Sequence, residues 1–133
     1  MAFDASTFVV HDVEWFPVVR VQSEAIRPGY AVQWVAEMNA LIARGEPFAV
    51  IYVGAQSDEA HEDRKRRGIW LKQHADALAR MCKVLVTVEA DDALREGARV
   101  SGRGVTRAFG IPHRAVANWS EALDIVSCRV EVN

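Results

Sequence analysis

A run of six apolar residues, FAVIYV over 48–53, constrains the fold of this chain more than any other feature. Pro47 precedes the run and Gly54 follows it, so residues that interrupt regular structure stand at both of its ends. Polar residues do not alternate with the apolar ones, which is typical of a strand that is covered on both faces in a parallel sheet. The run therefore predicts a buried strand at the centre of an α/β fold.

Two β-rich runs and a helical pattern precede this strand. The runs 7–11 and 15–21 predict an antiparallel hairpin, in which Pro17 lies on an edge strand or at a strand start because it cannot donate a hydrogen bond. Apolar residues then recur with the helical period over 30–44, and Gly45 predicts the end of that helix.

Helical and strand patterns continue to alternate after the central strand. The predicted elements are a long helix over 58–81 that Gly68 divides, a strand over 83–89, a helix from 91 to about 100, a loop or ragged helix end over 101–110, a short strand over 114–117, a helix over 118–126 and a small edge strand over 128–132. Such alternation indicates one α/β domain, with a mostly parallel sheet of about four to six strands, an amino-terminal antiparallel hairpin and covering helices.

Three of these helices begin at residues that suit a helix amino terminus. Ser57 can cap the long helix, Asp91 can cap the next one, and Asn118 has Glu121 three residues further on, which is the spacing of a capping box.

Composition excludes several classes of protein. The chain has 133 residues, of which 50% are hydrophobic and 26% charged, as in an ordinary single globular domain. A net charge of -2 gives no global field that would attract nucleic acid or an anionic membrane. The sequence has no leader pattern and no apolar run near the about 20 residues of a transmembrane helix, so we expect a cytoplasmic protein without membrane insertion.

The order of elements and several local sequences resemble the STAS domain, the small α/β fold of anti-sigma-factor antagonists. The matching stretches are ARGEPF at 43–48, AVIYVG at 49–54, KVLVTVE at 83–89 and WSEAL at 119–123. The resemblance covers about 15–127 and is closest to the divergent STAS-like proteins related to CRAL-TRIO lipid-binding domains.

This resemblance implies a non-enzymatic regulatory module of bacterial-type signalling that acts by contact with another protein. In signalling STAS domains, a serine in the loop after the central strand is phosphorylated, and the added charge breaks the partner interface. Here Ser57 has the equivalent position, without the preceding aspartate and following glycine of that motif, and a helix cap is the alternative role. The implied partner-binding residues are Gly54, Gln56, Ser57, Asp58, Glu59, Glu62 and Arg66.

The lipid-binding relatives suggest a second function, a carrier of a lipid or small molecule with an apolar pocket between sheet and helices. Trp34, Met38 and Trp70 are the candidate lining residues, although aromatic residues at helical spacing also suit a core. Self-association through an edge strand, 15–21 or 128–132, is a further hypothesis.

Catalytic and metal chemistry have no signature in the sequence. The four histidines lack metal-ligand spacing, the two cysteines form no metal or redox motif, and no nucleophile and base can be paired. We therefore assign no catalytic residue, metal or cofactor. Arg99, Arg103, Arg107 and Arg114 cluster in sequence and suit either a phosphate or acidic partner or a solvated basic region, whereas nucleic acid is disfavoured because aromatic residues do not alternate with them.

Overall fold

The computed structural model describes residues 5–54 and 59–131. Within these residues, four strands form one sheet in the order β1-β2-β3-β4, and every pair is parallel. The strands are β1 (Val18–Gln22), β2 (Phe48–Val53), β3 (Cys82–Val88) and β4 (His113–Val116). The run FAVIYV is therefore a strand inside the sheet, as predicted, and its first four residues are buried.

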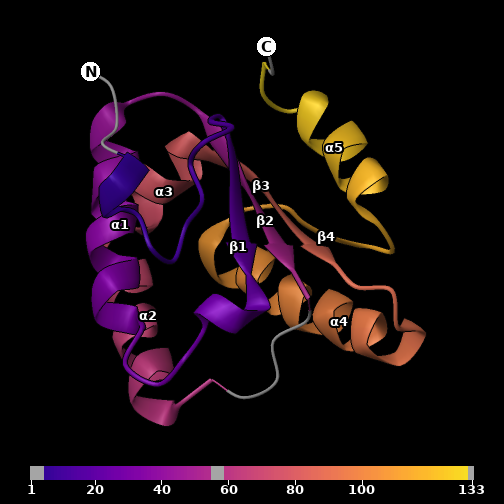
Figure 1. Cartoon of the computed structure of the whole chain (residues 1–133), viewed down its shortest axis with the longest axis horizontal. Coiled ribbons are helices and arrows are strands. Elements are labelled where there is room, and N and C mark those ends of the chain that lie inside the picture. Colours follow the sequence, from indigo (N-terminus) through magenta and orange to yellow (C-terminus); the bar gives the residue numbers. More distant parts are fainter. Residues whose placement is uncertain (1–4, 55–58, 132–133) are drawn as a thin grey trace.

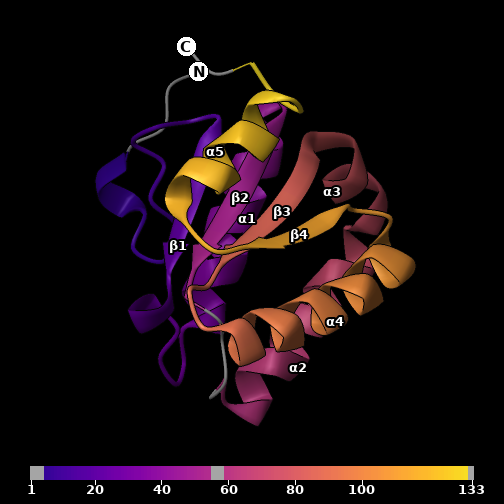
Figure 2. The same cartoon turned by 90° about the vertical axis from the view of Figure 1, so that its right-hand side faces the viewer.

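Five α-helices in the described part of the chain cover the sheet unequally (Figure 1). They are α1 (Ala31–Arg44), α2 (His61–Gln73), α3 (Ala75–Met81), α4 (Asp92–Phe109) and α5 (Trp119–Ser127), and two 3-10 turns, η1 (Ala5–Thr7) and η2 (Ser23–Ala25), flank β1. Because the strands lie side by side in sequence order, right-handed crossovers place α1 to α4 on one face. Figure 2 shows α5 on the opposite face.

Each face of the sheet buries its own apolar core. Side chains of β1 and β2 that alternate toward α1, α2 and α3 form the larger core, which includes Phe48 and Val50. The opposite face packs Ile51, Val84 and Val86 against α5. The non-alternating sequence of β2 thus reflects cover on both faces, as the sequence predicted.

The predicted amino-terminal hairpin is not confirmed. Residues 7–11 form no strand, and one isolated antiparallel bridge joins Asp12 to Arg20 of β1. Pro17 immediately precedes β1, which is one of the two positions predicted for it. The sheet of the described residues is therefore wholly parallel.

Glu37 on α1 explains why the segment before β1 is not a strand. Its carboxylate, 3% exposed, accepts hydrogen bonds from the backbone N–H groups of Val9, Val10 and His11 at 2.7, 3.1 and 2.7 Å. Three successive amides that converge on one carboxylate cannot also donate to a strand ladder. His11 Nδ1 at 2.8 Å and Gln33 Nε2 at 2.7 Å complete the shell around this carboxylate.

The long helix predicted over 58–81 is in fact two helices, and the predicted position of its division is wrong. The structure has two helices, which meet at His74 rather than at Gly68, and Gly68 lies inside α2. His74 leaves the helical conformation (φ -117°, ψ 17°), its Nδ1 lies 2.9 Å from the carbonyl oxygen of Trp70, and its ring stacks on the Trp70 indole. Trp70, which is buried, therefore fixes the break.

Two predicted boundaries near the carboxyl end are also corrected. The segment predicted as a loop or ragged helix end is regular helix: α4 continues through it to Phe109, and Gly110 (φ 75°) ends it. Residues 128–131 form a turn and irregular backbone rather than the predicted edge strand, and 132 lies outside the described residues. The capping predictions are confirmed at Asp91 and Asn118, whose side chains accept hydrogen bonds from Leu94 N and Glu121 N.

Gly102 lets α4 approach β4 closely. A Cβ at this position would lie 1.9 Å from His113 Nδ1, whereas a Cβ on Gly104 would meet nothing within 4 Å. We expect Gly102→Ala to lower the free energy of unfolding by about 1–2 kcal/mol, because the ring must move. The matched variant Gly104→Ala should instead gain up to about 1 kcal/mol from helix propensity. Urea denaturation of both variants checks this, and a gain for Gly102→Ala would contradict it.

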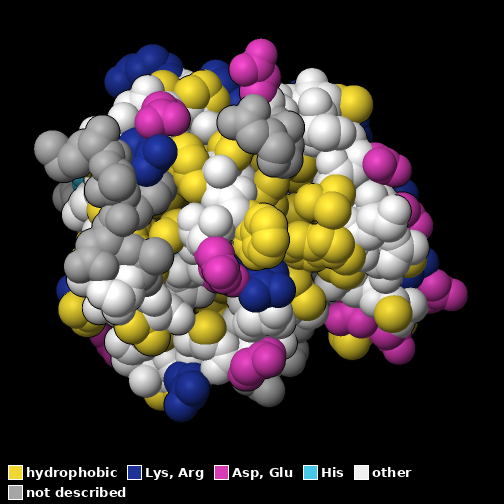
Figure 3. Space-filling view, turned by 45° about the horizontal axis from the view of Figure 1, so that its top comes forward, with side chains coloured by type: hydrophobic (Ala, Val, Ile, Leu, Met, Phe, Trp, Pro, Cys, Tyr) yellow, Lys and Arg dark blue, Asp and Glu magenta, His cyan; other side chains and the backbone are white. Residues whose placement is uncertain are grey.

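Apolar side chains also reach the surface. Figure 3 shows them gathered between charged side chains on one face of the molecule. Exposed large apolar residues of the molecule include Trp15 and Trp119. Self-association stays a prediction.

None of the described helices combines the length and apolar character that crossing a bilayer requires.

Candidate ligand-binding cleft

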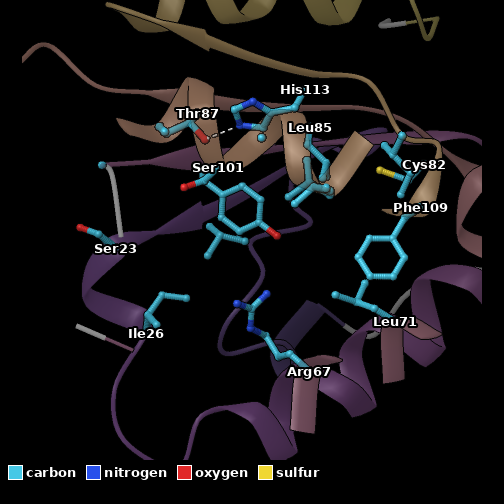
Figure 4. A pocket seen from close by; sticks show the side chains of 18 of the residues that line it. Ser23, Ile26, Arg67, Leu71, Cys82, Leu85, Thr87, Ser101, Phe109 and His113 are labelled. Carbon is cyan, nitrogen blue, oxygen red and sulfur yellow. Dashed lines mark hydrogen bonds between the residues drawn. The ribbon is translucent and has the colours of Figure 1, made fainter. Parts of the chain in front are cut away.

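A cleft of about 460 Å³ lies between the sheet and the helices on its more heavily covered face (Figure 4). Its floor includes Val21, Val50, Tyr52 and Leu85 from three neighbouring strands. Residues of α1, α2 and α3 form one wall, and α4 forms the opposite wall. Sites for small molecules are typically clefts of about 300–1,000 Å³, so the volume suits a small ligand.

The cleft exists because α4 stands beside the sheet rather than over its centre. α4 packs mainly on β4, at the sheet edge. The side chains that it turns to the cleft are mostly small: Ala93, Gly97, Ala98, Ser101 and Gly102. Such side chains cannot reach across to α1 and α2, so the space between the helices stays open.

One end of the cleft is apolar. Phe109 of α4 and Leu71 of α2 lie close to one another there, and Leu85 and Cys82 line the same region (Figure 4). A β-bulge turns both β3 residues to this side, because Phe48 pairs with Cys82 whereas Val50 pairs with Leu85. This end can hold the hydrocarbon part of a ligand.

Arg67 brings a charged side chain to the cleft. Figure 4 shows its guanidinium pointing from α2 into the space. Glu59, 6% exposed, accepts hydrogen bonds from Arg67 Nε and Nη2 at 2.5 and 2.7 Å, and a third from the Tyr30 hydroxyl. The guanidinium also lies 5.5 Å from the centroid of a Trp34 ring.

The Arg67–Glu59 pair is ionised and has no net charge. Burial disfavours both charged forms, but the mutual hydrogen bonds outweigh it, so the pKa of Glu59 is lowered and that of Arg67 is raised. Two of the five guanidinium N–H groups are used by Glu59. The remaining N–H groups of Arg67 can donate to a polar group of a ligand. That group need not be negatively charged, because Glu59 already neutralises the guanidinium.

Thr87 and His113 supply a neutral polar group at another part of the wall. Thr87 Oγ1 lies 3.0 Å from His113 Nε2, and the imidazole packs against Gly102 of α4. Burial lowers the pKa of His113, so the ring is neutral near pH 7. No carboxylate of the described residues hydrogen-bonds to this imidazole, so the pair lacks the group that orients the base in a catalytic triad.

Cys82 is not an activated nucleophile. Burial raises the pKa of its thiol to about 12, and its Sγ lies 3.7 Å from the carbonyl oxygen of Val84. A thiol with such a pKa is protonated near pH 7 and inert. Cys82 therefore lines the cleft as a protonated side chain.

The three predicted pocket residues have different roles. Trp34 and Met38 line the cleft. Trp70 does not line it: its ring packs edge-on against Trp34 at 5.2 Å, and its indole Nε1 donates to Asn39 Oδ1 at 2.8 Å. Trp70 is a core residue behind the wall, the alternative that its helical spacing allowed.

The predicted partner-binding residues are scattered. Gly54 lines the cleft, whereas Gln56, Ser57 and Asp58 lie outside the described residues. α2 begins at His61 with Ala60 as its N-cap, so Ser57 is not the cap of this helix. Glu59 is engaged inside the protein by Arg67 and Tyr30, whereas the predicted residues Glu62 and Arg66 are exposed on α2.

Several residues that line the cleft could not be predicted from the sequence. Arg67, Thr87, Ser101 and His113 come from four separate elements, and no local pattern joins them. One signal was present: Ala98, Val105 and Phe109 recur at helical spacing through the segment that glycines suggested was a loop. Across 5–54 and 59–131, no three His, Cys, Asp or Glu side chains are placed to hold a metal ion.

No protein-family model, no curated protein and no solved structure matches this chain.

Proposed function

We propose that this protein binds a small, mainly apolar molecule in the cleft between the sheet and α4. The observation that carries the proposal is a space of about 460 Å³ with an apolar end at Leu71 and Phe109 and polar groups at Arg67 and Thr87. Mostly apolar clefts with a few convergent polar groups are the usual form of small-molecule sites.

The lining defines the class of ligand. Hydrocarbon atoms would contact Leu71, Leu85 and Phe109, and one polar group would accept hydrogen bonds from Arg67. Because Glu59 balances the charge of Arg67, a hydroxyl or carbonyl group suits the site better than a carboxylate. Medium-chain alcohols, ketones and esters have this combination.

Binding of 1-decanol and decanoate tests the proposal. We expect quenching or enhancement of Trp34 fluorescence by 1-decanol, tighter binding of the alcohol than of the acid, and a mass increase in native mass spectrometry. Ala98→Phe should weaken binding about tenfold, because its ring displaces about two methylene groups of the probe at about 0.8 kcal/mol each.

Ala108→Phe is the matched control on the same helix. Ala108 is exposed and does not line the cleft, so this variant should bind like the original protein. Failure of every probe to bind, or equal binding by Ala98→Phe, would overturn the proposal.

A STAS-like regulatory module that contacts another protein is the second candidate. Gly54 lines the cleft together with Arg67 of α2, and Glu62 and Arg66 are exposed on the same helix, which favours a partner surface there. A pull-down with and without 1-decanol tests it. Loss of a partner with the variant Glu62→Lys/Arg66→Glu supports this candidate, and unchanged recovery counts against it.

A further inference from the structure

A basic groove lies at the free edge of the sheet, outside the ligand-binding cleft. Arg99, Arg103 and Arg107 recur every four residues on α4, and they line this groove together with Arg114 of β4. All four side chains belong to exposed residues. Within the described residues, Arg99 is paired with Glu96, whereas no carboxylate pairs with Arg103, Arg107 or Arg114.

The strand that borders the groove has unused backbone groups. β4 pairs with β3 on one side, and no described strand pairs with its other side. The carbonyl groups of Pro112 and Val116 bond to β3, at Leu85 N and Glu89 N. Because successive residues of a strand direct their backbone groups to opposite sides, His113 and Ala115 direct theirs to the free edge.

The spacing of the arginines matches that of an extended chain. Figure 2 shows α4 and β4 running side by side, and the two elements pack closely. Four residues of helix rise about 6 Å, and two residues of strand rise about 6.6 Å. Every second side chain of a strand added to β4 would therefore meet the next arginine of α4.

The walls of the groove are held firmly. Thr106 Oγ1 donates to the carbonyl of Ile111 at 2.7 Å, which ties α4 to the residues before β4. The imidazole of His113 fills the place of a side chain at Gly102 and hydrogen-bonds to Thr87. A groove whose walls are already positioned costs little ordering when a partner binds.

We infer that the groove binds an extended acidic segment of another protein, which adds as a strand to the free edge of β4. Backbone hydrogen bonds at His113 and Ala115 would supply affinity. Alternate Asp or Glu side chains would pair with Arg103, Arg107 and Arg99, in the mode of strand addition to an open sheet edge. This inference does not depend on the ligand proposed for the cleft.

A capped peptide of about seven residues that alternates glutamate and valine is the probe. Fluorescence anisotropy should detect binding that weakens with rising salt. In amide hydrogen exchange, His113 and Ala115 should become protected. The variant Arg103→Glu/Arg107→Glu should lose affinity about tenfold or more, because charge-assisted pairs become repulsive. Lys65→Glu/Lys72→Glu, two exposed positions on α2, makes the same charge change and should leave affinity unchanged.

Two further arms separate strand addition from simple anion binding. The same peptide with N-methyl groups on alternate residues keeps its charges but loses backbone donors, so it should bind about tenfold more weakly. A short oligothymidylate of equal charge should also bind weakly. Equal affinity for the N-methylated peptide or the oligothymidylate, or no detectable binding of the probe, would overturn the inference.

Discussion

Glu37→Gln should lower the free energy of unfolding by about 3 kcal/mol. The substitution removes the charge that three backbone amides, His11 and Gln33 all donate to, and it places an amide N–H₂ among these donors. Hydrogen bonds to a buried charged group are stronger than neutral ones, and a buried donor left unpaired is costly. Urea denaturation at neutral pH measures the loss.

The pH dependence of the difference provides an independent check. Burial opposes ionisation of Glu37, but the hydrogen bonds from His11, the backbone and Gln33 outweigh it and lower its pKa from 4.5 to about 2. A drop of this size corresponds to about 3 kcal/mol. Because the folded pKa is the lower one, this stabilisation is complete above about pH 4.5 and is lost as the pH falls toward 2. The stability gap between the original protein and Glu37→Gln should shrink over that range.

Glu46→Gln is the control for this prediction. Glu46 is also ion-paired, with Arg44, but its side chain is 54% exposed. Exposed pairs contribute little, so this variant should change stability by less than about 0.5 kcal/mol at any of these pH values. Equal losses for the two glutamine variants would show that Glu37 does not organise the segment before β1.

Arg67→Met should lower the free energy of unfolding by a similar amount, about 3 kcal/mol. The loss arises from Glu59, which is 6% exposed and would keep a buried charge with the Tyr30 hydroxyl as its principal remaining partner. Methionine preserves much of the arginine stem, so lost packing contributes little. Equilibrium unfolding in urea, with circular dichroism as the signal, is the measurement.

Two companion variants isolate the cause. Arg64→Met makes the same change on the same helix, but Arg64 is 65% exposed and its Nε lies 3.9 Å from Glu59, so the loss should stay below about 0.5 kcal/mol. Arg67→Met/Glu59→Gln removes both charges and should recover about half of the loss. A double variant no more stable than Arg67→Met would contradict the unpaired-charge explanation.

The repeating part of the fold could be predicted from sequence because local patterns encode it. The uninterrupted apolar run at 48–53 specified a strand covered on both faces, and Gly45, Asp91 and Asn118 marked helix ends through their own local chemistry. The errors fell where distant contacts override local preference. The Glu37 carboxylate accepts hydrogen bonds from backbone amides that are 26 to 28 residues away in the sequence. These bonds prevent the strand that the β-rich run at 7–11 suggested.

The site was harder to predict for the same reason. Trp34 and Met38 were identified because an apolar helix face must point to the sheet, where the cleft lies. Arg67 was missed because it lies in the charged run HEDRKRR at 61–67, where no local pattern marks one side chain as the partner of a buried carboxylate. The glycines of α4 suggested a loop, whereas Gly102 is required by the close approach of His113.

The unequal cover of the sheet has a consequence for how the protein assembles during synthesis. Ile51, Val84 and Val86 are shielded on their side by α5, a helix of nine residues that follows β4 in the chain. As the chain leaves the ribosome, α1, α2 and α3 can pack on their face while the other face still lacks its helix. An apolar surface of this kind, exposed on a nascent chain, is a substrate for chaperones and for aggregation. Translation through residues 119–130 is therefore the step that ends this vulnerable period.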